Sequence, residues 1–246
     1  MFYLNYNRYP YLLACIVSSI LTVLVAIWGY AEILTITPKH NIKQWENLQE
    51  KSDIAFNQKN AESTRNRLQK AISLNRNNAE FYMSLAQLNV LQADLTALSK
   101  QEKISYQNQA IDNFKLAISK RPSWGLAWAK LAQAYANEPK QSSEFIQALE
   151  RALYFEPYEK LSQQHIIPLA IAQWGTLPDS IKKRTKATIQ HALRYQSNII
   201  HLITNTTITY DWEDELAPLL TRKSHKNVLS KAMHKKKQNI DKAKFD

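Results

Sequence analysis

Four short stretches of this chain share one pattern, in which a large apolar residue precedes a small alanine by three positions and an aliphatic residue follows it. The four alanines are Ala71, Ala117, Ala152 and Ala192, spaced 46, 35 and 40 residues apart. Residues three apart lie on one face of a helix, and a small residue there lets a second helix approach closely. A helix stop or its equivalent follows five residues after each alanine, as at Pro122 and Pro157. Each stretch therefore predicts the second helix of a helix–turn–helix repeat, and the repetition predicts a solenoid.

The third repeat carries the most specific form of this pattern. Its first helix supplies an aromatic residue, a leucine, a small residue and a tyrosine, and its second helix supplies the alanine and a closing proline: Trp128, Leu131, Ala132, Tyr135, Ala152 and Pro157. Their order and spacing resemble the tetratricopeptide repeat, a unit of about 34 residues, with alanine where the consensus has glycine. The resemblance covers residues 43–197. It implies an α-solenoid in which Trp128 and Tyr135 are buried between helices.

The other repeats depart further from this consensus. The second has about a dozen extra residues between its helices, and the first and fourth are degenerate. An ordinary helical bundle is the alternative to a solenoid. Pro139 marks the turn inside the third repeat, Gly175 and Pro178 mark the turn inside the fourth, and Pro168 predicts a kink. We expect helix pairs over residues 42–58 and 61–75, 78–95 and 101–120, 123–136 and 141–154, and 158–173 and 178–196.

A long apolar stretch precedes the repeats. Residues 11–31 carry no charge, and as a helix they extend about 31 Å, which matches the hydrocarbon core of a bilayer. Aromatic residues flank both ends, as expected at the two headgroup regions: Tyr3, Tyr6, Tyr9, Tyr11, Trp28 and Tyr30. The stretch predicts one transmembrane helix behind a flank of residues 1–10. We expect Thr37 and Pro38 to end it, and Asn41 to cap the first helix of the repeats.

Two alternatives remain open for this N-terminal segment. A cleaved signal peptide has a shorter apolar core and a more basic start, although residues 29–31 form a tolerable cleavage site. Arg8 on one flank and Lys39 and Lys43 on the other nearly balance the positive-inside signal. We favour a cytoplasmic N-terminus, with the helical domain on the periplasmic side of a bacterial inner membrane.

Composition excludes several other fold classes. The chain has only three glycines, none of them clustered, so it lacks the glycine-rich loops of phosphate-binding and dinucleotide folds. β-Branched runs are scarce, and the one strand-like piece, residues 206–210, has no evident partner. The single cysteine, Cys15, lies in the apolar run and excludes a disulfide framework. The fold class is therefore all-α, with a transmembrane helix followed by about four helix pairs over residues 42–197.

The C-terminal part differs in composition from the repeats. Residues 198–221 should cap the open end of the solenoid, with a helix that starts in the acidic run 211–215. Residues 222–246 carry nine of the 32 lysines and arginines and few apolar anchors, so we expect a disordered basic tail. Such a tail could bind anionic lipid or polysaccharide through its lysines. The alternative is a solvated tail without a partner. Nucleic acid is disfavoured because no aromatic residue is interleaved with the lysines before Phe245.

No motif in the chain predicts catalysis. The six histidines show no close pairing with glutamate, so we expect neither a metal nor a cofactor. The acidic run 211–215 is explained as a helix start, and no serine or cysteine has the neighbourhood of a nucleophile. We therefore expect a non-enzyme that binds other proteins.

The resemblance to tetratricopeptide proteins implies a concave face lined by the first helix of each pair. In the second and third repeats, the positions that would face this concave side are small or neutral, and we expect them to contact a protein partner: Met83, Gln87, Val90, Ala129, Gln133 and Ala136. The overall layout is similar to that of small membrane-anchored repeat proteins of the VpsP type, which accompany bacterial exopolysaccharide synthesis. It implies a scaffold with an accessory role in envelope or exopolysaccharide biosynthesis or export. The alternative is a carbohydrate-binding module in which Trp124 and Trp174 stack on sugars and basic residues meet acidic groups. Both tryptophans in one open groove would favour that alternative.

Overall fold

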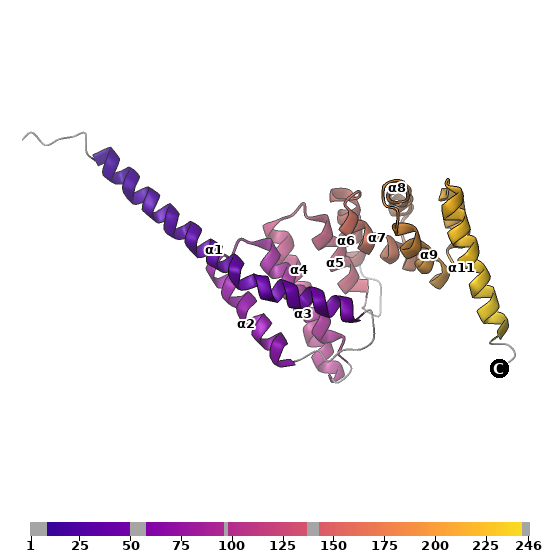
Figure 1. The fold of residues 1–246 in the computed structure, drawn as a ribbon, viewed down its shortest axis with the longest axis horizontal. Coiled ribbons are helices and arrows are strands. Elements are labelled where there is room, and N and C mark those ends of the chain that lie inside the picture. The colour runs from indigo at the N-terminus through magenta and orange to yellow at the C-terminus, as the bar shows by residue number, and fades with distance from the viewer. Residues whose placement is uncertain (1–8, 50–57, 96–97, 137–142, 243–246) are drawn as a thin grey trace, which may run out of the picture. The chain divides into compact units, whose positions relative to one another are not determined.

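The computed structural model describes residues 9–49, 58–95, 98–136 and 143–242. Within those ranges the chain forms α-helices and two short 3-10 helices, and no strand, so the all-α class is confirmed (Figure 1). The chain divides into two compact units, an N-terminal unit of residues 1–120 and a C-terminal unit of residues 121–246.

The helices of the repeats begin and end within three residues of their predicted bounds, except the first, which is part of a longer helix. The N-terminal unit contains α1 (Tyr9–Gln49), α2 (Gln58–Leu74), α3 (Ala79–Ala93) and α4 (Lys100–Lys120). The repeats of the C-terminal unit contain α5 (Gly125–Ala136), α6 (Ser143–Phe155), α7 (Lys160–Ala172), η1 (Trp174–Thr176) and α8 (Asp179–Tyr195). Its last part contains α9 (Ile199–Thr209), α10 (Glu213–Leu216), η2 (Ala217–Leu219) and α11 (Lys223–Lys242).

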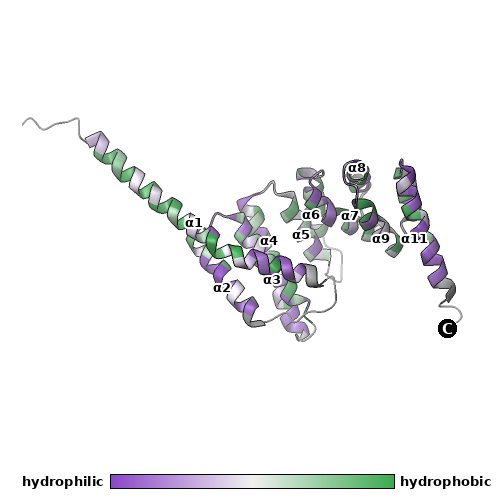
Figure 2. Ribbon diagram, viewed as in Figure 1, coloured by the Kyte–Doolittle hydropathy of each residue, from purple (hydrophilic) through white to green (hydrophobic). Residues whose placement is uncertain are grey.

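Helix α1 joins the apolar segment to the N-terminal unit without a break. Its first half is apolar and unburied, and the helix is long and apolar enough to cross a membrane (Figure 2). The predicted break at Thr37 and Pro38 is wrong, because Pro38 lies inside the helix. Interior proline costs about 3 kcal/mol, and packing of the second half of α1 on α2 and α3 offsets that cost. Asn41 is not a cap, since its Nδ2 donates to Thr64 Oγ1 of α2 over 3.1 Å.

The N-terminal unit is built from neighbouring helices in chain order, with α1 on α2, α2 on α3 and α3 on α4. Aliphatic side chains of α1, α2 and α3 form one core cluster, and Ala71 and Phe81 join Ala31 of α1 in another. A polar contact crosses the same helices. Arg65 Nη2 donates to Asn89 Oδ1 over 2.6 Å and also to Gln92, and its guanidinium lies 5.7 Å from the ring of Tyr106 in α4.

The C-terminal unit packs α5 on α6 and α7 on α8, as predicted, and also α5 on α7 and α7 on α9. The repeated alanines Ala71, Ala117, Ala152 and Ala192 all have zero exposed area, as closely approaching helices require. Tyr135, Leu131 and Ala132 are buried, whereas Trp128 is half-buried and donates its Nε1 to the Pro122 carbonyl over 2.8 Å.

The connections follow the turn signals where the structure describes them. Gly175 lies in η1, and Pro178 immediately precedes α8, which places the turn of the fourth repeat where it was expected. Pro168 lies inside α7, which continues to Ala172. The turn at Pro139 lies outside the described residues.

The end of the chain corrects two predictions. Residues 206–209 are helical and belong to α9, so the strand-like pattern there is misleading. Residues 223–242 form α11 rather than a disordered tail. Leu229 and Val228 of α11 join the core cluster around Ile203 and Trp212, and α11 packs beside α9. A few apolar residues on one helix face are enough to order this basic segment, while residues 243–246 lie outside the described part.

Candidate partner-binding groove

The C-terminal unit presents a groove across α5, α7 and α9, which lie next to one another (Figure 1). Residues in and just after these three helices line a cavity of about 500 Å³. Its polar lining consists of Gln133, Gln164, His165, Gln173, Asn205, Thr206, Thr209 and Tyr210. Its apolar lining consists of Ala136, Pro168, Leu169 and Ala172. We call this surface the amide groove.

The amide groove carries no formal charge. Neither Asp, Glu, Lys nor Arg lines it. Burial of the imidazole lowers the pKa of His165 to about 3, and the nearby positive charge of Lys130 acts in the same direction. His165 is therefore neutral throughout the physiological pH range. Amide and hydroxyl groups both donate and accept, so the groove can pair with the N–H and C=O groups of an extended chain.

The structure brings two of the predicted partner-binding residues into this groove. Gln133 is exposed and Ala136 is half-buried, and both line it. Ala129 was predicted to bind a partner, but it has no exposed area. Helix α5 packs on both α6 and α7, so two of its faces are covered and only the face with Gln133 remains.

The residues of α3 that were predicted to bind a partner are mostly not free to do so. Met83 is only 4% exposed. Gln87 donates its Nε2 to Glu46 Oε1 of α1 over 3.2 Å, because α1 packs on α3. Val90 remains half-buried. The chain's own first helix therefore takes part of the face assigned to a partner.

Most of the amide groove was missed from the sequence. Gln164, His165 and Gln173 belong to the degenerate fourth repeat, and Asn205 and Thr209 belong to a helix that was taken for part of a cap. The sequence signal that could have found part of it is the repeat spacing. The residue 35 positions after Gln133, one repeat length further along the chain, is Pro168, which also lines the groove.

The two tryptophans assigned to sugar stacking do not share a groove. Trp124 is half-buried just before α5, with the Arg121 guanidinium 5.0 Å from its ring. Trp174 lies in η1 and packs edge-on against Trp212, with ring centroids 4.9 Å apart. It lines a separate cavity of about 680 Å³ with residues of α8 and α10. Neither tryptophan lines the amide groove.

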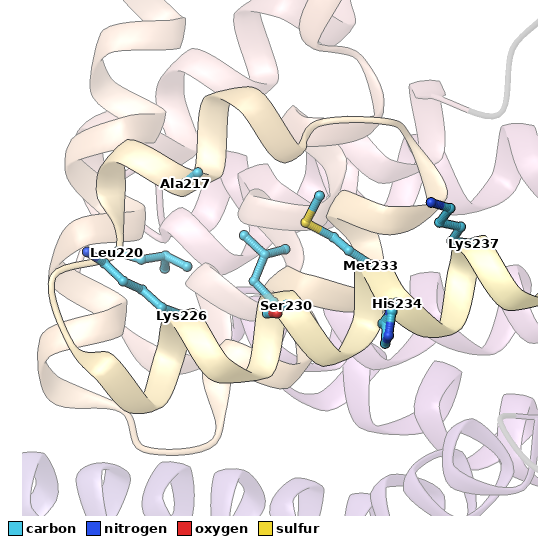
Figure 3. A pocket seen from close by; sticks show the side chains of 8 residues that line it. Ala217, Leu220, Lys226, Ser230, Met233, His234 and Lys237 are labelled. Carbon is cyan, nitrogen blue, oxygen red and sulfur yellow. The ribbon is translucent and has the colours of Figure 1, made fainter.

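Helix α11 borders a third cavity, of about 740 Å³, and its lining is mainly apolar. Figure 3 shows Leu220 and Met233 reaching into the space between η2 and α11. Lys236 pairs with Glu213 over 2.8 Å and with Asp211, which holds α11 against the start of α10. Other lysines of α11 are exposed, including Lys226 and Lys237 at the rim of this cavity.

The acidic run 211–215 behaves as a helix start, since α10 begins at Glu213. Glu215 pairs with Lys186 over 2.6 Å. Hydrogen bonding from Lys186 is the main cause that lowers the Glu215 pKa, with a further contribution from Trp174. Among the described residues, no three His, Cys, Asp or Glu side chains are grouped so as to hold a metal ion. Cys15 is exposed on the apolar half of α1.

The chain matches no protein-family model, no curated protein sequence and no solved structure.

Proposed function

We propose that this protein is a membrane-anchored scaffold whose helical repeats hold an extended, uncharged segment of a protein partner in the amide groove. The observation that carries the proposal is the lining of that groove. Three helices, α5, α7 and α9, contribute amides, hydroxyls and a neutral histidine to it. A positively charged peptide end would lose solvation there and would also meet the positive charge of Lys130, whereas an extended backbone would keep its hydrogen bonds.

The helix pairs support a tetratricopeptide-like α-solenoid. Within the C-terminal unit, α5 packs on α7, and α7 packs on α9. The second helices of the pairs, α6 and α8, pack on α5 and α7 respectively and on each other. Fully buried alanines at the repeated position allow this close approach. In such an array the first helices form one continuous face, and the amide groove lies on that face.

Helix α1 supports the membrane anchor. The side chains of residues 11–30 are exposed or nearly so, and most are apolar, an arrangement stable in lipid but costly in water. Trp28 and Tyr30 remain 48% exposed near the end of the apolar segment, as residues of a headgroup layer should. We place the anchor in a bacterial inner membrane with the repeats on the periplasmic side, in an accessory role in envelope or exopolysaccharide biosynthesis.

Two measurements test the anchor and its orientation. Alkaline washing of membranes should leave the full-length protein in the pellet, and recovery of a soluble form starting near Glu32 would contradict an anchor. A reporter that is active only outside the cytoplasm, fused after Asp246, should be active. A silent fusion, with a cytoplasmic reporter active at the same position, would reverse the orientation.

A matched pair of substitutions tests the groove. Gln133 lies in the amide groove, and Gln147 is an exposed glutamine on α6 outside it. Gln133→Lys places an unpaired charge in a neutral groove, while Gln147→Lys makes the same chemical change elsewhere. Full-length proteins are purified from detergent-solubilised membranes, and co-purified proteins are quantified by mass spectrometry. We expect Gln133→Lys alone to lose partners that the wild type retains. If the wild type and both variants retain the same partners at the same levels, the groove does not bind the partner and the proposal is wrong.

A further inference from the structure

Helix α11 carries positive charge that the scaffold role does not use. Its sequence contains seven lysines against one acidic residue, Asp241. Lys236 faces the protein and pairs with Asp211 and Glu213. Five further lysines are exposed and form no ion pair within the described residues: Lys223, Lys226, Lys231, Lys235 and Lys237. These ammonium groups are therefore free to meet an anionic ligand.

Part of this charge borders the cavity of about 740 Å³ between η2 and α11 (Figure 3). The lining residues of α11 follow one another at spacings of three or four positions, so they share one face of the helix: Lys226, Leu229, Ser230, Met233, His234 and Lys237. Lys226 and Lys237 stand at the two ends of this face, about 16 Å apart along the helix axis. The two ammonium groups therefore mark both ends of the cavity's rim.

Apolar side chains form the interior of this cavity. Leu220 and Leu229 belong to the core cluster of the C-terminal unit and are 3% and 5% exposed, so they form a fixed floor. Ala217 and Met233 are exposed, and 45% of the Met233 surface is accessible to a ligand. Cavities of about 300–1,000 Å³ with a mainly apolar lining are typical of small-ligand sites. A hydrocarbon chain would leave water on entering this cavity, which favours its binding.

The rim selects the charge of the ligand's head group. Lys226 and Lys237 line it, and no acidic side chain among the described residues does. An anionic head group gains charge-assisted hydrogen bonds from the ammonium groups, and the Ser230 hydroxyl is a further donor. A head group that also carries an ammonium group would meet like charge and find no carboxylate. A hydrocarbon chain with an anionic phosphate head therefore satisfies the interior and the rim together.

We propose that this cavity and the face of α11 that lines it bind an anionic phospholipid. One acyl chain lies along Leu220, Leu229 and Met233, and the phosphate lies at the rim, where Lys226 and Lys237 supply the positive charge. A membrane is the source of this ligand, because the proposed anchor in α1 keeps the chain close to lipid at high local concentration. The inference does not depend on the partner-binding role of the amide groove, since the two cavities share no lining residue.

Native mass spectrometry of the full-length protein tests this assignment. The protein is purified in a neutral detergent and mixed with equal amounts of phosphatidylglycerol and phosphatidylcholine that carry the same acyl chains. Phosphatidylglycerol should be retained roughly ten-fold more, because two lysines contribute to its binding alone. Equal retention of the two lipids would overturn the proposal. Glycerol phosphate tests the head group without a chain, and trigalacturonate tests an acidic polysaccharide. Displacement of phosphatidylglycerol by either competitor would also overturn it.

Paired substitutions locate the site. Lys226→Gln combined with Lys237→Gln should abolish the preference for phosphatidylglycerol, and the pair cannot disturb the core because both lysines are exposed. Lys223→Gln combined with Lys231→Gln removes the same charge from the same helix outside the cavity and should leave the preference unchanged. Met233→Gln should lower the amount of phosphatidylglycerol retained, because the acyl chain loses an apolar contact. Lipid bound at α1 is common to all of these variants, so the differences report on α11. An unchanged preference in the first pair, or an equal loss in the control pair, would overturn the site.

Discussion

Gly125 is the position at which the helix packing can be tested most directly. It begins α5, where the chain leaving α6 passes close by. A Cβ atom added there would lie 2.5 Å from Glu156 Cβ and 2.9 Å from the Glu156 backbone nitrogen. Side-chain rotation cannot relieve a contact with backbone. Gly125→Ala should therefore force α5 and the end of α6 apart.

The cost can be worked out from these contacts. Overpacking of this kind costs roughly 1–3 kcal/mol. The displaced Glu156 carboxylate also accepts hydrogen bonds from the Leu126 N–H and the Ser162 hydroxyl, both over 3.0 Å, and losing a cap of this kind costs about 1 kcal/mol. Alanine recovers at most about 1 kcal/mol through helix propensity. A net loss of about 1–3 kcal/mol remains, which corresponds to a fall in Tm of roughly 2–12 °C for a chain of this size.

Gly175 supplies the control, because no atom lies within 4 Å of a Cβ added there and its φ is not positive. Gly175→Ala should leave stability unchanged or raise it by about 0.4–1 kcal/mol. Thermal unfolding of the full-length proteins in detergent, followed by far-ultraviolet circular dichroism, measures both. If Gly125→Ala and Gly175→Ala melt together, α5 and the end of α6 do not approach as described.

Two further substitutions test the buried contacts of the helix pairs. Ala152→Trp places a large ring at a fully buried position and should cost about 1–3 kcal/mol or more, while Gln147→Trp on the exposed side of α6 should stay within about 0.5 kcal/mol, as measured by the same melts. Arg65→Met leaves the buried Asn89 carbonyl oxygen without its donor and should lower the free energy of unfolding by about 1–3 kcal/mol, whereas the exposed Arg67→Met should not.

Sequence periodicity located most helices because their apolar residues recur on one face and prolines or polar turns separate them. The ends of α5 and α8 illustrate this, since each lies within about two residues of its prediction. Periodicity failed at Pro38, where local propensity predicts a break but tertiary packing on α2 and α3 maintains the helix. It failed again in α11, whose few apolar residues, such as Leu229, give a weak signal against many lysines.

The groove was only partly predictable for a related reason. A repeat pattern identifies which residues occupy equivalent positions, and two of the residues that it selected, Gln133 and Ala136, line the amide groove. It does not show which faces a helix shares with further neighbours. Ala129 is covered because α5 contacts two helices, and Gln87 is engaged by α1, which lies far from it in the sequence. Tertiary packing, rather than the repeat pattern, decides which of the predicted binding residues are covered by neighbouring helices.

His165 makes the stability of the C-terminal unit depend on pH. Its pKa is about 3 in the folded protein, lowered from an ordinary value of 6.5 mainly by burial. The unfolded chain therefore binds more protons than the folded one between these two values, so stability is fully present above pH 6.5 and is lost as the pH falls toward 3. Between pH 8 and pH 5 the loss is about 1–2 kcal/mol, since part of the ring still contacts solvent.

Replacing His165 by glutamine keeps a hydrogen-bonding side chain in the amide groove and removes the titration. The wild type should be less stable at pH 5 than at pH 8 by at least the amount given above. His165→Gln should lose that amount and keep the contribution of buried His225, whose pKa is also lowered by burial. His201→Gln, an exposed histidine on α9, should keep the whole difference. Urea unfolding of the three full-length proteins in detergent at both pH values gives the comparison. An unchanged pH dependence in His165→Gln would mean that the imidazole is well solvated. In that case it would be charged in mildly acidic conditions, and the neutrality of the groove, on which the choice of an uncharged partner segment depends, would be lost.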